Sequence, residues 1–226
     1  MTARAERIGT AGSTGTGTGL RARAIRVANS SDPDRPIVAD VSVDAAPGRT
    51  LVIVGESGAG KSMLARAICG LAPAQFTTSG TVELAGRTID LGVAADSLRR
   101  LRGGGIVWLP QDPFTSLSPL HRCGAQVLAH RQGSRSERAE RALARLAEVG
   151  LPARAARAYP HQLSGGMRQR VAIAAALDAA PSVLIADEPT TALDVTTQKE
   201  ILTLLASLRD ARGMALVLVT HDLALA

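Results

Sequence analysis

Residues 50–62 read TLVIVGESGAGKS, an apolar run that leads directly into a glycine-rich loop ending in lysine and serine. The loop fits the pattern G-x-x-x-x-G-K-[ST], and the apolar run supplies the strand that must precede it. Glycines let successive backbone N–H groups point at a phosphate chain, while the lysine adds positive charge and the serine hydroxyl can ligate Mg²⁺. We therefore predict a phosphate-binding P-loop rather than a turn that binds nothing. Its members are Gly55, Glu56, Ser57, Gly58, Ala59, Gly60, Lys61 and Ser62.

Composition limits the classes of partner. The chain has 226 residues, 46% of them hydrophobic. No apolar run approaches the ~20 residues of a membrane span, and the N-terminus lacks the apolar region of a secretory leader. We therefore expect a soluble, cytoplasmic chain. The net charge of +6 comes from arginines scattered among glutamates, without a basic patch interleaved with aromatic residues, so no nucleic-acid partner is expected.

Hydrophobic patterns predict an α/β chain. Short alternating patterns over 20–27 and 37–43 predict strands joined by a polar, proline-containing loop. Uninterrupted apolar runs at 182–186 and 215–220 are typical of parallel strands that are buried on both faces. The pattern over 196–209 predicts the helix that crosses between them.

The middle of the chain is predicted to be helical. Residues 134–137, SRSE, have capping-box spacing, and Gly150 marks the end of the helix that follows. A second helix is predicted over 165–177. The side chains expected to share the buried face of the first helix are Ala139, Leu143, Leu146 and Ala147.

Two carboxylates follow the apolar run that ends at Ala186. In a P-loop enzyme the first, Asp187, would hold Mg²⁺ directly or through water. The second, Glu188, lies where a carboxylate can polarise an attacking water. Acidic pairs at strand ends also occur as solvated caps, and it is the P-loop upstream that favours the functional interpretation.

A second anion site is predicted at residues 163–170, LSGGMRQR. Its glycines open a helix, so exposed N–H groups and the positive end of the helix dipole face the same point. As an isolated pattern this is an ordinary helix start at Ser164. Together with the P-loop and the carboxylate pair, at these separations, it resembles the signature motif of ATP-binding cassette (ABC) ATPases. The resemblance covers about Leu20 to the C-terminus.

Three further positions match motifs of that family. Gln111 is similar to the Q-loop glutamine, which in the family contacts Mg²⁺ or the water. Residues 191–194, TALD, resemble the D-loop, which touches the opposite subunit and here ends at Asp194. His221 follows the last apolar run and matches the switch histidine that contacts the γ-phosphate.

The resemblance implies a P-loop NTPase fold with a RecA-like core, an antiparallel β edge and an inserted helical subdomain at about 112–166. Residues 1–20 are low-complexity and expected to be disordered, so the ATPase domain is predicted over 21–226. Family members bind ATP and Mg²⁺ and dimerise head to tail, so that Ser164, Gly165 and Gly166 of one subunit close on the phosphates held by the other. ATP hydrolysis then drives membrane permease subunits, which places such a protein peripherally on the cytoplasmic face of the membrane.

The particular residues within two of the motifs indicate which subfamily the chain resembles. Residues 111–119, QDPFTSLSP, and 55–58, GESG, resemble the ATPases of oligopeptide, dipeptide and nickel importers. The implied function is an ATPase that energises import of peptides, nickel or a similar small solute, which a solute-binding protein delivers to the permease. The second ATPase is either another copy or a different chain. The alternatives are a soluble ABC ATPase outside transport and a truncated, inactive cassette.

Two features depart from the family pattern. Family members stack adenine on an aromatic residue before the P-loop, but residues 1–75 contain none, so adenine is expected on an aliphatic or arginine surface around 26–28. The chain also stops at Ala226, five residues after His221, whereas family members continue. The domain is therefore expected to be short at its C-terminus, with apolar surface beside its last strand left uncovered.

Overall fold

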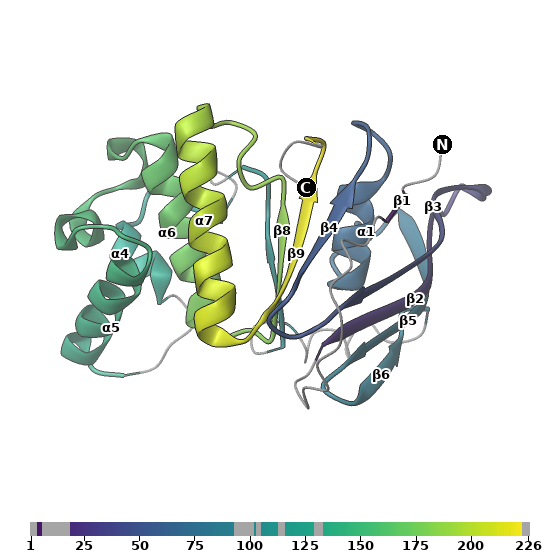
Figure 1. The fold of residues 1–226 in the computed structure, drawn as a ribbon, viewed down its shortest axis with the longest axis horizontal. Helices are drawn as coiled ribbons and strands as arrows, with labels where there is room; N and C mark the ends of the chain where they lie inside the picture. The colour runs from purple at the N-terminus through teal and green to yellow at the C-terminus, as the bar shows by residue number, and fades with distance from the viewer. Residues whose placement is uncertain are drawn as a thin grey trace. The chain divides into compact units, whose positions relative to one another are not determined.

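The computed structural model describes residues 4–5, 19–92, 102, 105–112, 116–128 and 133–222. These form two compact units (Figure 1). Unit 1 holds the described residues within 1–108, 181–188 and 208–226, and unit 2 those within 109–180 and 189–207. The disorder predicted for residues 1–20 falls almost wholly outside the described residues. None of the described helices is long and apolar enough to cross a membrane.

A five-stranded sheet carries the P-loop of unit 1, with the strand order β1-β4-β9-β8-β7. The strands β4 (Thr50–Val54), β9 (Ala215–Thr220) and β8 (Val183–Asp187) run parallel. The short β1 (Arg4–Ala5) pairs antiparallel with β4, and β7 (Ile106–Leu109) lies beside β8. Every residue of β8 and β9 is buried, as their apolar runs predict. The uncovered apolar surface expected beside the last strand is therefore wrong for β9, because β9 lies between β4 and β8. Because parallel strands end at the same edge, the residues that follow β4, β8 and β9 meet there.

A four-stranded antiparallel sheet forms the second layer of unit 1, in the order β3-β2-β5-β6. Its strands are β2 (Leu20–Asn29), β3 (Asp32–Ala45), β5 (Phe76–Leu84) and β6 (Arg87–Asp90). The proline-containing loop predicted between the first two strands is wrong, because β3 begins at Asp32 and includes Pro33 and Pro36. This strand lies at the edge of the sheet, where a residue without an N–H donor is tolerated.

The two sheets of unit 1 share one hydrophobic core with helix α1 (Lys61–Ile68). Leu64, Ala65 and Ile68 of this helix are each about 1% exposed. They lie in the same cluster as Ile53 of β4 and Val217 of β9. This packing fixes the start of α1 over the edge where β4, β8 and β9 end.

Unit 2 is helical. Its elements are α4 (Cys123–Val127), α5 (Arg135–Glu148), two 3₁₀ helices at Ala153–Arg157 and Pro160–Gln162, α6 (Gly165–Asp178) and α7 (Val195–Arg212), the last turn of which belongs to unit 1. The capping box that begins α5 is confirmed: Glu137 N donates to Ser134 Oγ over 3.3 Å, and Ser134 N donates to Glu137 Oε2 over 2.8 Å.

The buried face predicted for α5 is only partly right. Leu146 is fully buried, but Leu143 is 40% exposed and Ala139 is exposed as well. Ala142 and Val149 take their places in the core. The helix is rich in alanine and arginine, so several faces carry similar apolar character and the pattern alone does not separate them.

Candidate functional site

The P-loop joins the end of β4 to the start of α1, as its sequence predicts. Gly58 and Gly60 have φ angles of 81° and 86°, a region that only glycine occupies without strain. Gly60 is also pressed against β3, since a Cβ there would lie 2.7 Å from the carbonyl oxygen of Ile37. Gly60 is the N-cap of α1 and offers no side-chain cap, so the first N–H groups of the helix stay available to an anion.

Lys61 folds back over its own loop. The residue is 4% exposed, and its Nζ donates to Gly55 O over 2.8 Å and to Glu56 O over 2.9 Å. The same nitrogen lies 3.9 Å from Glu188 Oε1. A buried ammonium needs such partners, and the two loop carbonyls provide them within the P-loop itself.

Ser62 and Asp187 are directly bonded. Ser62 Oγ donates to Asp187 Oδ1 over 2.9 Å, and Asp187 is 2% exposed at the end of β8. Burial raises the pKa of Asp187, the bond from Ser62 opposes this rise, and the neighbouring charge of Glu188 adds to it. The pair presents a hydroxyl and a carboxylate oxygen side by side, which is the kind of donor set that Mg²⁺ prefers.

Glu188 and His221 are also in contact, a contact that was not predicted. His221 Nδ1 lies 3.1 Å from Glu188 Oε2, with the histidine side chain 50% exposed and the glutamate 13%. Glu188 has a φ of 45°, and its N–H donates to Val219 O over 2.9 Å. A left-handed backbone at a glutamate is uncommon and places this carboxylate between Lys61 and His221.

In unit 2, the signature residues pack against the segment that includes residues 191–194. Ser164 caps α6, with its Oγ accepting from Met167 N over 3.3 Å. A Cβ on Gly165 would lie 3.2 Å from Leu193 Cδ2, and one on Gly166 would lie 2.6 Å from Thr197 Cγ2. The absence of a side chain at both glycines is what allows this close approach.

Asp194 caps α7. Its two carboxylate oxygens accept from Thr197, from the backbone N over 3.0 Å and from the hydroxyl over 2.7 Å, and these bonds lower the pKa of Asp194. The side chain of Gln198 donates to Thr190 O and Leu193 O, which holds the loop before the helix. Gln111 follows β7, is exposed, and belongs to unit 2.

The predicted site residues thus form two groups. Lys61, Ser62, Asp187, Glu188 and His221 meet in unit 1, through the contacts given above. The signature residues and Asp194 meet in unit 2 through Thr197, which the sequence reasoning missed. The only sign of Thr197 in the sequence is its place three residues after a helix-capping aspartate.

The surface expected around residues 26–28 for adenine is mostly buried. Val27 and Ala28 are 0% and 4% exposed, whereas Ile37 is 40% exposed and lies against Gly60 of the P-loop. The exposed aliphatic side chain next to the P-loop therefore comes from β3 and not from the end of β2.

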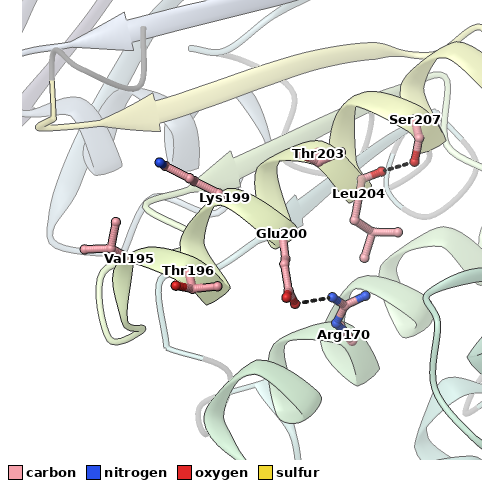
Figure 2. A pocket seen from close by; sticks show the side chains of 8 residues that line it. All are labelled: Arg170, Val195, Thr196, Lys199, Glu200, Thr203, Leu204 and Ser207. Carbon is pink, nitrogen blue, oxygen red and sulfur yellow. Dashed lines mark hydrogen bonds and ion pairs between the residues drawn. The ribbon is translucent and has the colours of Figure 1, made fainter.

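A hollow in unit 2 lies along α7 and includes Arg170, the last residue of the motif at 163–170. It is lined by α7 and by Arg170 of α6, and Arg170 Nη2 and Glu200 Oε2 form an ion pair of 2.9 Å across it (Figure 2). Arg170 Nη1 also donates to Val149 O over 2.9 Å. These contacts tie α6 to α7 and to the end of α5.

The family model of the ABC transporter matches residues 38–191, and the chain belongs to this family. The chain is 48% identical over 184 residues to a probable peptide ABC transporter ATP-binding protein, y4tR, of Sinorhizobium fredii, covering 78% of this chain and 55% of that protein. It is 45% identical over 193 residues to the dipeptide transport ATP-binding protein DppD of Escherichia coli, covering 82% and 58%. The chain thus spans little more than half the length of these relatives.

Solved structures confirm the fold class. The ATP-binding cassette MJ0796, in a dimeric post-hydrolysis state bound to ADP and Pi, superposes with a TM-score of 0.76 at 31% identity, covering 92% of this chain and 90% of that one. The cbiO1 protein of Clostridium perfringens, part of the transporter complex cbiONQ, gives 0.74 at 28% identity, covering 90% and 78%. The fold is that of an ABC nucleotide-binding domain.

Proposed function

We propose that this chain is the ATP-binding and ATP-hydrolysing part of an ABC importer for peptides or a chemically similar small solute. The observation that carries the proposal is the convergence of Lys61, Ser62, Asp187, Glu188 and His221 at one edge of a parallel sheet. The relatives named for peptide and dipeptide transport support the cargo class. Binding of ATP is supported by the P-loop, where no side chain caps the start of α1 and the Lys61 ammonium lies against the loop carbonyls.

Ser62 and Asp187 of unit 1 are the residues that would hold Mg²⁺. Their oxygens are already 2.9 Å apart, and Mg²⁺ sites commonly combine one or two carboxylates with the phosphates of a substrate. When bound, Mg²⁺ neutralises charge on the phosphate oxygens. Lys61 would exchange its loop carbonyls for a phosphate oxygen, which is a stronger acceptor because it is charged.

Glu188 is the proposed group that orients the attacking water. Its carboxylate contacts His221 on one side and lies near Lys61 on the other, so both neighbours constrain its position. His221 is half-exposed and can turn from Glu188 toward the γ-phosphate. Such a site lowers the barrier mainly by positioning and by neutralising charge.

The remaining motif residues would act on a nucleotide that a partner subunit holds. Ser164, Gly165, Gly166 and Asp194 gather in unit 2, and we propose that they close on the phosphates held by a second ATPase subunit, either another copy or a different chain. The dimeric state of MJ0796 supports this arrangement. Permease subunits are the proposed membrane partners, with a solute-binding protein acting through them, so the chain would lie peripherally on the cytoplasmic face of the membrane.

Transport by reconstituted vesicles tests the proposal. The chain is combined with candidate permease subunits and a candidate solute-binding protein from the same organism, and uptake of labelled di- and oligopeptides is measured with and without ATP. We expect ATP-dependent uptake that Lys61→Ala abolishes, because charge-assisted contacts to phosphate are each worth roughly 1.5–3 kcal/mol. Arg21→Ala, which removes only an exposed ion pair to Glu83, is the matched control and should transport normally. Hydrolysis without uptake would favour the soluble ATPase instead.

A further inference from the structure

Arg66 lies on the same face of α1 as Ser62, one turn further along the helix. Its guanidinium carbon is 5.1 Å from the centre of the Trp108 ring, within the range of a cation–π contact. Trp108 belongs to β7, the neighbour of the strand that ends at Asp187. The stack therefore joins the helix that carries Lys61 and Ser62 to the strand beside Asp187.

Both members of this stack hold a buried donor without a partner. Arg66 Nε and Trp108 Nε1 are inaccessible to solvent, and neither has a hydrogen-bond partner among the described residues. Buried donors are nearly always satisfied in folded proteins, so an acceptor is expected within reach of a small movement. Asp187 is the acceptor that the geometry offers. It ends β8, which the bond from Val183 N to Gly105 O aligns with β7, and Ser62 on the same face of α1 as Arg66 already bonds it.

We propose that Arg66 and Trp108 are positioning residues for Asp187. Ser62 bonds one oxygen of this carboxylate from the side of the P-loop. The stacked pair supplies charge and an N–H donor from the side of β7, so the carboxylate is held from two directions. The inference rests on the proposed function, in which Asp187 is a ligand of Mg²⁺. Groups that orient a ligand in this way commonly change metal affinity about 10–100-fold when they are removed.

The planar guanidinium explains why an arginine stands at this position. It can lie flat over the indole and still direct Nε elsewhere, whereas a lysine keeps the charge but loses the stacking and the second donor. Trp108 also lies against the core of unit 1, so packing is the rival explanation that the test must separate. A packing role and a positioning role differ in one respect: only the second acts selectively on Mg²⁺-dependent binding.

The test measures binding of a fluorescent ATP analogue in EDTA and across a Mg²⁺ titration. The variants are Arg66→Ala, Arg66→Lys and Trp108→Phe, with Arg21→Ala as the control. We expect the Mg²⁺ concentration that produces half of the gain in affinity for the analogue to rise about 10–100-fold in Arg66→Ala and Trp108→Phe. The rise should be smaller in Arg66→Lys, and the affinity in EDTA should be unchanged in all three variants. The chain has one tryptophan, so emission from Trp108 is an independent readout. Adding Mg²⁺ to the ADP-bound wild type should change the emission from Trp108, and this response should be absent in Arg66→Ala.

The outcomes separate this inference from the proposed function. If the wild type does not bind the analogue, the proposed function fails. If the wild type binds it in a Mg²⁺-dependent manner and the folded variants keep the same Mg²⁺ dependence, only the positioning role is overturned. Equal losses of affinity in EDTA and in Mg²⁺, together with a lower melting temperature, would mean that the stack is packing and would overturn it as well. Should Arg66→Ala fail to fold, Arg66→Lys and Trp108→Phe decide the question.

Discussion

Replacing Gly166 by alanine should destabilise unit 2 through one identifiable contact. The new Cβ would lie 2.6 Å from Thr197 Cγ2, closer than two carbon atoms can approach. Thr197 cannot simply rotate, because its hydroxyl bonds Asp194 Oδ2 over 2.7 Å at the cap of α7 and its β-branched side chain has few rotamers. Something in this contact between α6 and α7 must therefore move.

The magnitude follows from two opposing terms. Overpacking of this kind costs roughly 1–3 kcal/mol, and removing a glycine from a helix returns about 0.5–1 kcal/mol. Taking the middle of each range, the expected net loss is roughly 1 kcal/mol in the free energy of unfolding. Thr197→Ser deletes only the methyl group that clashes and keeps the hydroxyl that bonds Asp194. In the double variant the cost should disappear while the helix gain remains, so stability should equal or exceed that of the wild type.

Urea unfolding of the four proteins, followed by circular dichroism, measures the coupling as a double-mutant cycle. Gly165→Ala is the matched control, because its Cβ would be 3.2 Å from the movable end of Leu193 and should cost less. The reasoning is refuted if Gly166→Ala is as stable as the wild type, or if Thr197→Ser does not restore it. Either result would mean that the contact with Thr197 does not set the stability at position 166.

Three further outcomes are expected. Glu188→Gln should bind MgATP as the wild type does but hydrolyse it about 10²–10⁴-fold more slowly, measured as phosphate release under single-turnover conditions, and near-normal turnover would remove Glu188 from catalysis. GTP should compete with ATP within about tenfold in a displacement assay, because Ile37 offers only an aliphatic surface beside the P-loop, and a strong preference for ATP would contradict this. Burial raises the pKa of the Cys69 thiol to about 12, so at pH 8 it should react with a thiol reagent only after urea unfolding, and rapid labelling of the native chain at this residue would count against that environment.

Sequence patterns were most informative where one physical demand dominates. The strands β8 and β9 are buried on both faces, so their apolar runs could not be confused with surface segments. The P-loop and the start of α6 were found because glycine is required at particular positions. Sequence patterns gave wrong predictions in two places. The prolines suggested a loop in what is an edge strand, and the alanines on several sides of α5 made its buried face hard to identify.

Contacts between segments that are distant in the chain could not be predicted from the sequence. Nothing in the local pattern around Arg66 indicates that it meets Trp108, because the contact depends on how α1 packs on the sheet that contains β7. The same is true of His221 and Glu188, which were each predicted to act on the nucleotide and are found in contact with each other. Motifs identify which residues carry the chemistry, whereas the packing of helices on sheets decides which of them touch.

The prolines of β3 have a consequence for the behaviour of the chain at high concentration. An edge strand normally exposes a row of N–H and C=O groups to which a strand of another molecule can add. Pro33 and Pro36 remove two donors from the N-terminal part of this edge, and the neighbouring exposed side chains of Asp32, Asp34 and Arg35 are charged. A second sheet cannot extend from this stretch without leaving acceptors unpaired and charges crowded. The irregular start of β3 thus protects unit 1 against fibre-like association.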